Sequence, residues 1–154
     1  MRSSSTSSAA DRSVRDLIAK QDILELISRY SYNWDNKNPD GLAELFTEDA
    51  SWEWWPPGAN KPGAVHKSRK AITSWAAERF TTNLADRQTR HYQTNTVFLE
   101  LGENRARTQT MILVTHSITG NKGPKIPAHS GIYEDEFTRS SDGWRIHRRV
   151  LRTD

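Results

Sequence analysis

The segment RHYQTNTVFLEL, residues 90–101, decides the fold, because polar and apolar side chains alternate along it with the period of two that is typical of a β-strand. One face of this strand is predicted to carry His91, Gln93, Asn95, Val97, Leu99 and Leu101. The turn signal Gly102-Glu103-Asn104 follows, so we expect a hairpin whose second strand runs from Arg105 to about His116. The inner face of that strand is predicted to hold Ala106, Thr108, Thr110, Ile112 and Val114.

Upstream of this hairpin the apolar residues have helical spacing. A long first helix is predicted over roughly residues 13–34, with Ser13 as its N-cap. Asn38 and Pro39 are typical of the start of a second helix, which is expected to end near residues 48–49. Its inner face would comprise Leu42, Leu45 and Phe46.

The remaining elements follow from alternation and turn signals. They are a short strand over 50–55, a loop over 56–67, a third helix over about 69–80, a polar connection over 81–90, a loop over 117–127, and strands over about 128–139 and 144–152. This order predicts an α+β domain in which a curved antiparallel sheet wraps around helices and leaves an internal cavity. We expect one domain over residues 13–154, preceded by a disordered, Ser-rich tail over residues 1–12.

Composition excludes several classes of function. The chain has 154 residues, a formal net charge of +3 and no Cys, so disulfides and thiol nucleophiles are excluded and nucleic acid is not an expected partner. No apolar run approaches the roughly 20 residues of a membrane helix, and a cytoplasmic protein is expected. The five His residues form no recognisable metal motif, and no Gly-rich phosphate loop is present, so neither a metal nor a cofactor is expected.

Aromatic residues are concentrated in the short strand that contains Trp52 and Trp54. The two indoles share one strand face, which is compatible with ordinary core packing. The alternative is that they line a cavity for a flat or cyclic ligand, together with Trp34, Phe46, Ile112 and Val114.

Asp35 and His91 are the candidate catalytic pair. Asp35 falls at the C-terminal end of the first helix, where it either begins a turn or reaches towards the sheet. His91 is either a core histidine or a base. If the two meet, the carboxylate fixes the tautomer of the imidazole and raises its basicity, which suits proton abstraction without a cofactor.

Further polar residues are candidates for binding a substrate. Tyr133 is suited to donating a hydrogen bond to a substrate carbonyl, and Arg149 to doing so with full charge. His129 and Tyr30 are expected to face the same cavity. A structural hydrogen bond is the alternative for each of these side chains.

The chain resembles the SnoaL-like branch of the NTF2-like superfamily, within it the scytalone dehydratase and hexachlorocyclohexane dehydrochlorinase group. The resemblance rests on residues 22–35, 42–54, 91–95, 133–137 and 143–146. It implies a cone-shaped fold of three N-terminal helices and a sheet, and an acid/base dyad at Asp35 and His91. It also implies an arginine at Arg149 that helps to hold a leaving group, and a homodimer or homotrimer. Trp34 stands where scytalone dehydratase has a tyrosine.

The leading functional hypothesis is a cofactor-independent lyase or isomerase, of dehydratase type, acting on a small hydrophobic cyclic or polycyclic substrate. One alternative is a noncatalytic hydrophobic-ligand-binding protein or oxygenase accessory subunit. Another is a polyketide or terpenoid cyclase of secondary metabolism in which pocket shape guides the reaction.

Overall fold

Nine helices and strands make up the part of the chain that the computed structural model describes, which is residues 8–118, 120 and 125–154. In chain order they are α1 (Ala9–Asp35), α2 (Pro39–Ala43), β1 (Phe46–Trp55), β2 (Ala64–Lys67), α3 (Arg69–Thr81), β3 (Arg87–Leu101), β4 (Arg105–Ile118), β5 (Ile126–Ser140) and β6 (Gly143–Thr153). The predicted α+β class is therefore confirmed, with helices gathered in the N-terminal half.

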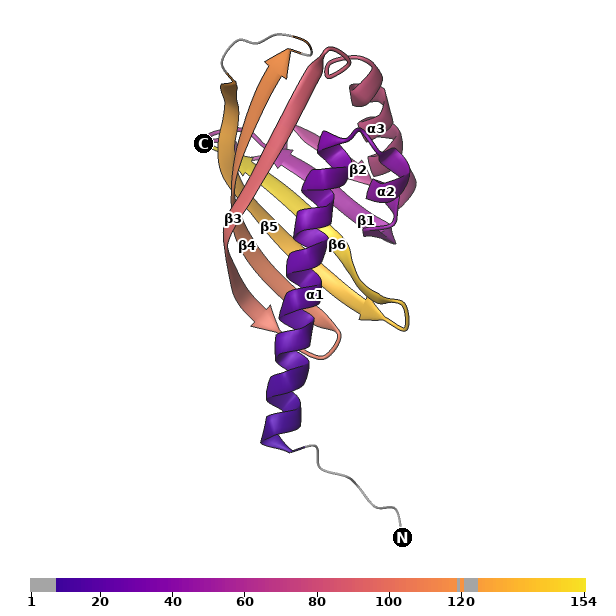
Figure 1. The fold of residues 1–154 in the computed structure, drawn as a ribbon, viewed down its shortest axis with the longest axis vertical. Coiled ribbons are helices and arrows are strands. Elements are labelled where there is room, and N and C mark those ends of the chain that lie inside the picture. The colour runs from indigo at the N-terminus through magenta and orange to yellow at the C-terminus, as the bar shows by residue number, and fades with distance from the viewer. Residues whose placement is uncertain (1–7, 119, 121–124) are drawn as a thin grey trace.

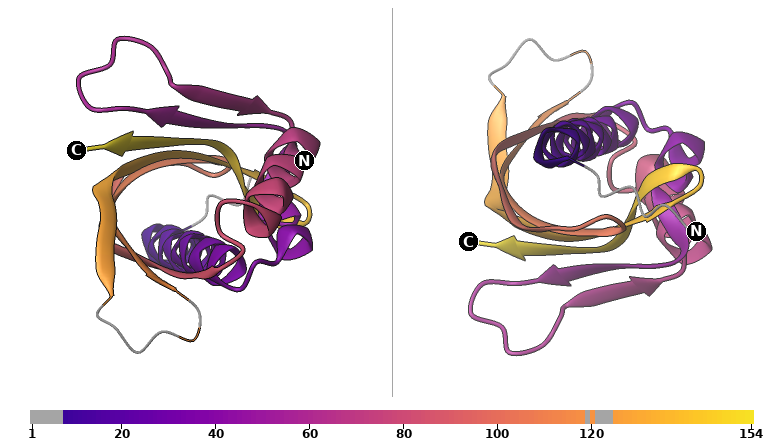
Figure 2. Two further views of the ribbon diagram at one scale, coloured as in Figure 1. Left: turned by 90° about the horizontal axis from the view of Figure 1, so that it is seen from above. Right: turned by 90° about the horizontal axis from the view of Figure 1, so that it is seen from below.

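The six strands form one curved sheet in the order β2-β1-β6-β5-β4-β3. Strands β3 to β6 curl around α1 without closing into a barrel, while α2 and α3 cover one end of the concave face (Figures 1 and 2). Neighbouring strands are antiparallel except β1 and β6, which run parallel. The expectation of a purely antiparallel sheet was wrong at this pair, because β1 reaches the sheet from α2 rather than through a hairpin with β6.

Helix α1 begins four residues earlier than predicted. Ser8 is its N-cap, and Ser8 and Asp11 form a capping box in which each side chain accepts from the other's backbone N–H. The prediction of Ser13 as N-cap, and of disorder over residues 9–12, was therefore wrong. Residues 1–7 of the predicted tail lie outside the described residues.

The buried stripe of α1 starts only at Ala19. The first turns extend beyond the sheet (Figure 1), so Val14, Leu17 and Ile18 remain more than half exposed. From Ile23 onwards the helix lies in the concave face and contributes Ile27, Tyr30 and Trp34 to the core. The C-terminal half is thus the part of α1 that positions side chains for a site.

Several predicted boundaries were wrong around α2 and α3. Helix α2 is only five residues long, and Phe46 begins β1 instead of lying on a helix face. Strand β2 lies within the predicted loop, where it pairs with β1. Strand β3 begins at Arg87 rather than His91, which brings Thr89 into the sheet.

A β-bulge divides β3 into two halves. The register with β4 shifts between Thr94 and Val97, and Asn95 has a positive φ of 54°. Beyond this bulge the faces are exchanged, so Val97 and Leu99 are exposed while Phe98 packs against the core. The prediction that Val97 and Leu99 share the inner face with His91 was wrong, because it assumed an uninterrupted alternation and the bulge exchanges the two faces.

The inner faces of β4 and β5 follow the alternation as predicted. Residues Ala106, Thr108, Thr110, Ile112 and Val114 of β4 are buried, as are Gly131, Tyr133 and Phe137 of β5. Together with α1 and α3 they enclose the core. No helix within the described residues is long and apolar enough to span a membrane.

Replacing Gly131 with Ala is predicted to destabilise the domain by about 2–4 kcal/mol. A Cβ at this position would overlap the backbone carbonyl of Arg152 on β6, so the two strands would have to separate. Urea unfolding measures the change, and Gly102→Ala is the control because its Cβ would meet ordinary contacts. Equal stability of the two variants would contradict the close approach of β5 and β6.

Candidate active site

A cavity of about 540 Å³ lies between the C-terminal half of α1, helix α3 and the concave face of the sheet. Its size is in the range that encloses a small organic ligand. The lining comprises Tyr30, Trp34, Trp52, Trp54, Pro57, Ala64, Trp75, Arg79, Leu84, His91, Val114, His116, His129, Tyr133, Leu151, Thr153 and Asp154. Of the residues predicted from sequence, Tyr30, Trp34, Trp52, Trp54, His91, Val114, His129 and Tyr133 are among them.

Asp35 and His91 are in direct contact at the wall of this cavity. His91 Nδ1 lies 2.6 Å from Asp35 Oδ1, and both side chains are more than nine-tenths buried. Because the carboxylate accepts, the Nδ1 atom carries the proton, and the Nε2 atom is the ring nitrogen left to face a ligand. The imidazole edge also contacts Trp34, with ring centroids 5.9 Å apart.

The carboxylate of Asp35 is held by two further donors. Thr89 Oγ1 donates to Oδ1 at 2.7 Å, and the backbone N–H of His91 donates to Oδ2 at 2.9 Å. Burial favours the neutral acid, but these hydrogen bonds and the interaction with His91 outweigh it and lower the pKa of Asp35. Asp35 is therefore ionised at neutral pH and oriented by three contacts.

Tyr30 and Tyr133 lie on another wall of the cavity, in edge-to-face contact at 5.8 Å. Trp52 Nε1 donates to the Tyr30 hydroxyl at 3.2 Å. Burial raises the pKa of both tyrosines. Both hydroxyls consequently stay protonated and are available as donors to a ligand.

Arg149 lies behind these two tyrosines rather than in the cavity. It is fully buried, donates to both oxygens of Asp135 at 2.8 Å, and stacks 4.0 Å from the Tyr30 ring and 4.2 Å from the Tyr133 ring. Although burial lowers the pKa of Arg149, the Asp135 carboxylate outweighs it and raises that pKa. Arg149 was predicted to contact the substrate, but the structure places it against the Tyr30 and Tyr133 rings and not among the residues that line the cavity.

Phe46 and Ile112 are also absent from the lining. Phe46 is completely buried at the edge of the Tyr30 ring, and Ile112 is 3% exposed. Both belong to the core that supports the wall. Their assignment to the substrate surface was wrong because burial on the inner face does not distinguish core from cavity.

Three cavity residues that matter chemically were missed. Trp75 stacks on His66 and makes tilted ring contacts with Trp52 and Trp34, and Arg79 follows one turn later on α3. His116 lies on β4 two residues beyond Val114, so the period of two already placed it on the inner face. Helical spacing pointed to Trp75 as inward, but nothing in the sequence distinguished a cavity position from a core position.

The cavity imidazoles differ in their surroundings. Burial, followed by nearby cationic groups, lowers the pKa of His116 and of His129, so both are neutral at physiological pH. Neither has a carboxylate partner among the hydrogen bonds of the described residues, in contrast to His91. Among the described residues no cluster of His, Asp or Glu is arranged to hold a metal ion.

A match to the SnoaL-like domain family covers residues 15–150. The chain belongs to the SnoaL-like family. The resemblance inferred from sequence is thereby confirmed. A search of curated protein sequences finds no significant match.

Solved structures with the same fold include enzymes and a subunit of an enzyme. A candidate scytalone dehydratase from Novosphingobium aromaticivorans is 26% identical, with a TM-score of 0.77 over 92% of this SnoaL-like chain and 88% of that one. LinA, a hexachlorocyclohexane dehydrochlorinase, is 18% identical, with a TM-score of 0.71 over 92% and 90%. The β subunit of a candidate aromatic-ring-hydroxylating dioxygenase from N. aromaticivorans is 17% identical, with a TM-score of 0.76 over 90% of both chains. The last two likenesses show the fold alone.

Replacing Asp35 with Asn is predicted to lower the free energy of unfolding by about 1–3 kcal/mol at neutral pH, because a buried charge-assisted network is weakened. The pKa of Asp35 is lower in the folded state than in the unfolded state. The contribution of ionised Asp35 to the free energy of unfolding is therefore complete above the ordinary aspartate pKa of about 3.9, and it is lost as the pH falls through the pKa of the folded state. The difference between wild type and variant should shrink over that acidic window.

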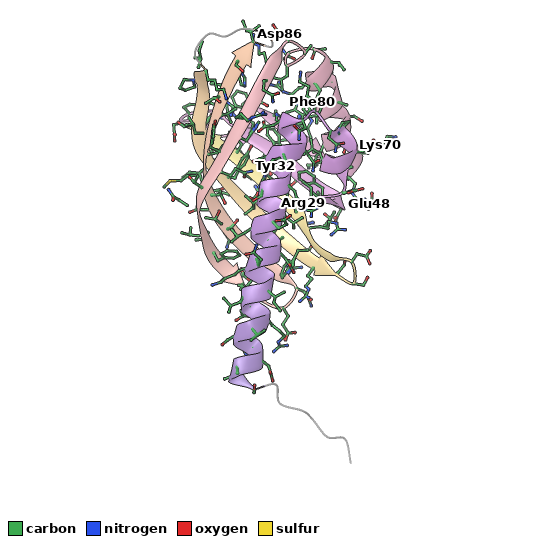
Figure 3. All side chains as sticks on the ribbon, in the orientation of Figure 1. Arg29, Tyr32, Glu48, Lys70, Phe80 and Asp86 are labelled. Atoms are coloured by element: carbon green, nitrogen blue, oxygen red, sulfur yellow. The ribbon has the colours of Figure 1, made fainter. Side chains whose placement is uncertain are left out.

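Urea unfolding across that pH range measures the effect, and the control is Asp86→Asn at the exposed end of the loop after α3 (Figure 3). A difference that stays constant down to the lowest pH at which the protein folds would contradict the depressed pKa of Asp35.

Replacing Asp135 with Asn is predicted to destabilise the domain by about 3–5 kcal/mol, because the guanidinium of Arg149 would keep its charge in a fully buried position. The matched control is Glu134→Gln, which breaks the partly exposed pair with Arg152 and should change stability by about 0–1 kcal/mol. Denaturant unfolding of both variants tests this, and similar losses would show that the buried pair has no special weight.

Proposed function

We propose that this SnoaL-like protein is a cofactor-independent lyase or isomerase in which His91 is the general acid/base and Asp35 orients it. The observation that carries the proposal is the 2.6 Å contact between the two side chains, with the imidazole forming part of the cavity wall. A carboxylate in this position fixes the tautomer and stabilises the imidazolium that forms when Nε2 takes a proton. The family match and the likeness to a candidate scytalone dehydratase support a lyase-type role.

The proposed reaction begins when His91 Nε2 removes a proton from a carbon next to a carbonyl group. The C–H electron pair moves into the adjacent bond, and negative charge develops on the carbonyl oxygen. In an elimination the electron pair of this enolate then expels a hydroxide from the neighbouring carbon. The imidazolium gives its proton to the departing hydroxide, which leaves as water. In an isomerisation the same proton is delivered to a different carbon.

The tyrosine hydroxyls are the proposed site for the oxygen that gains charge. Tyr30 and Tyr133 are protonated donors in a buried setting, where a hydrogen bond to a developing oxyanion is most effective. Arg149, stacked behind both rings, favours negative charge on this side of the cavity. Its proposed role is electrostatic and acts through the tyrosines, without contact to the substrate.

The aromatic lining supports a small hydrophobic, cyclic substrate. Trp34, Trp52, Trp54 and Trp75 present large flat surfaces, and Val114 and Leu151 add aliphatic ones. Such walls bind through burial of apolar area and through ring stacking. A one-ring or two-ring compound is compatible with a cavity of about 540 Å³.

Replacing His91 with Ala or Asp35 with Asn is predicted to lower turnover by about 10²–10⁴-fold, the usual contribution of general acid/base catalysis. The assay would screen cyclic β-hydroxy ketones for enone absorbance, and would follow by NMR the exchange of protons next to the carbonyl in deuterated water. The exchange assay detects proton abstraction even where no leaving group is present.

The matched control is His147→Ala. His147 lies 3.5 Å from Asp49 in an exposed pair, so this variant removes a second histidine with a carboxylate neighbour outside the cavity. Its turnover should equal that of wild type. Folded His91 and Asp35 variants that keep full turnover would refute the dyad and would favour catalysis by pocket shape, as in a cyclase.

A second candidate function is that of a noncatalytic ligand-binding protein or oxygenase accessory subunit. The likeness to a dioxygenase β subunit favours it. This function would retain the cavity but would not need His91 Nε2, so ligand binding without proton exchange in any tested compound would support it. Copurification with a larger catalytic chain would support the subunit version.

The outer face of the sheet has exposed apolar residues suited to contact with another copy. Tyr92, Val97, Leu99, Met111 and Leu113 lie there on β3 and β4, each more than two-fifths exposed. A homodimer or homotrimer is the prediction that follows from the family resemblance, and these side chains are suited to its interface.

A further inference from the structure

Arg79 is a cation of the cavity wall with no anionic partner. It lies on α3 one turn after Trp75, in the lining of the cavity. Its Nε atom is buried and has no hydrogen-bond partner, and no ion pair joins its guanidinium to a carboxylate within the described residues. Its guanidinium carbon lies 5.7 Å from the centroid of the Trp75 ring.

Arg79 differs in its ion pairing from the buried and half-buried arginines of the sheet. Arg149 is paired with Asp135, although its Nη1 atom is also buried without an acceptor, and Arg148 donates to Glu53 and Glu136. A buried guanidinium nitrogen without an acceptor is unfavourable, since its hydration is lost and nothing replaces it. Arg79 Nε therefore has no acceptor within the described residues, and a ligand can supply one.

The carboxylates near the cavity are already engaged elsewhere. Asp35 accepts from His91 and Thr89, and Asp154 accepts from Ser130. The facing imidazoles of His116 and His129 have lowered pKa values, to which the charge of Arg79 contributes after burial, so they are neutral rather than additional cations. Arg79 is thus a cation of the lining that forms no ion pair with a carboxylate among the described residues.

We infer that the ligand of this cavity carries an anionic oxygen group, a carboxylate on an aromatic or cyclic body, and that Arg79 binds it. The planar guanidinium matches a carboxylate with two parallel hydrogen bonds, and burial of its Nε strengthens them. Trp75, Trp34 and Trp52 would hold the ring next to it. The inference shares the cavity with the proposed function and names its substrate class, but it does not depend on the dyad.

The test is a comparison of two probes with the same ring, 2-naphthoate and 2-naphthylmethanol, of which the first has an anionic carboxylate at position 2 and the second a neutral hydroxymethyl group. Binding is measured by isothermal titration calorimetry at about pH 7, where a carboxylic acid is ionised. The wild type should bind naphthoate at least about 10-fold more tightly than the alcohol, the size of effect that a charge-assisted bidentate pair provides. Arg79→Gln should remove this preference and change the affinity for the alcohol by less than about 3-fold.

Lys70→Gln is the matched control variant. Lys70 lies on the same helix but is exposed at the outer edge of the molecule (Figure 3), so this change removes one positive charge without altering the cavity. It should keep the full preference for naphthoate. If Arg79→Gln does not fold, Arg79→Lys is tested in its place. This variant keeps the positive charge but loses the planar guanidinium, so it should retain only part of the preference for naphthoate over the alcohol.

Equal affinity of the wild type for the two probes would overturn the inference, and so would a preference that survives in Arg79→Gln or failure of both probes to bind. Asp35→Asn separates this outcome from that of the proposed function. It should abolish turnover but keep the preference for naphthoate, since Arg79 has no contact with Asp35 in the structure. Loss of turnover and loss of anion recognition are therefore independent readouts.

Discussion

The carboxylate of Asp35 fastens helix α1 to the sheet. It accepts from the hydroxyl of Thr89 and from both the backbone and the ring of His91, while Gln88 donates to its backbone carbonyl. A negative charge at a helix C-terminus opposes the helix dipole and costs about 0.3–1 kcal/mol. Hydrogen bonds to a charged group contribute about 1.5–3 kcal/mol each, so the network outweighs that cost. The helix thus ends at the carboxylate that the proposed chemistry uses.

The same face of β3 continues this attachment. Two residues beyond His91, Gln93 donates to the carbonyl of Ile27 at 2.8 Å and to the hydroxyl of Ser31 at 2.6 Å. Every second residue of this part of β3, namely Thr89, His91 and Gln93, therefore forms hydrogen bonds to the last turns of α1. Rigid placement of a base between a helix and a sheet is what general base catalysis needs, because a small displacement from the reacting proton lowers the rate steeply.

Local periodicity predicted which side chains face inward as far as the bulge, but it did not predict that Asp35 and His91 are in contact. The alternation of β3 put His91 and Gln93 on the inner face, and the helical spacing of α1 put Tyr30 and Trp34 one turn apart on one side. It failed after Asn95, because a single residue of positive φ exchanges the two faces of a strand. Asn tolerates that conformation, but a bulge depends on how β4 crosses β3, which no local pattern contains.

The buried pair behind the tyrosines shows a second limit of the sequence. Alternation along β5 places Asp135 inward between Tyr133 and Phe137, a position that a carboxylate occupies only when it is paired. Its partner, Arg149, lies directly opposite on β6, and that register could not be read from either strand alone. Because the register was unknown, the sequence allowed Arg149 to be interpreted as a substrate contact. The register pairs Arg149 with Asp135 and fixes its guanidinium against two aromatic rings.

The resulting charge distribution explains why the proposed chemistry needs no movement of charged groups. One negative charge, on Asp35, stands behind the base that becomes positive during proton abstraction. Two guanidinium groups, that of Arg149, which is paired with Asp135, and that of Arg79, stand behind or beside the positions that become or remain negative. His116 and His129 are neutral between them and therefore do not compete with His91 for the role of cation. A field already oriented in this way stabilises charge separation as it develops, which is the general source of electrostatic catalysis. It also requires that the substrate lie with its acidic C–H towards β3 and its oxygen towards Tyr30, so the lining fixes one orientation of an otherwise featureless ring.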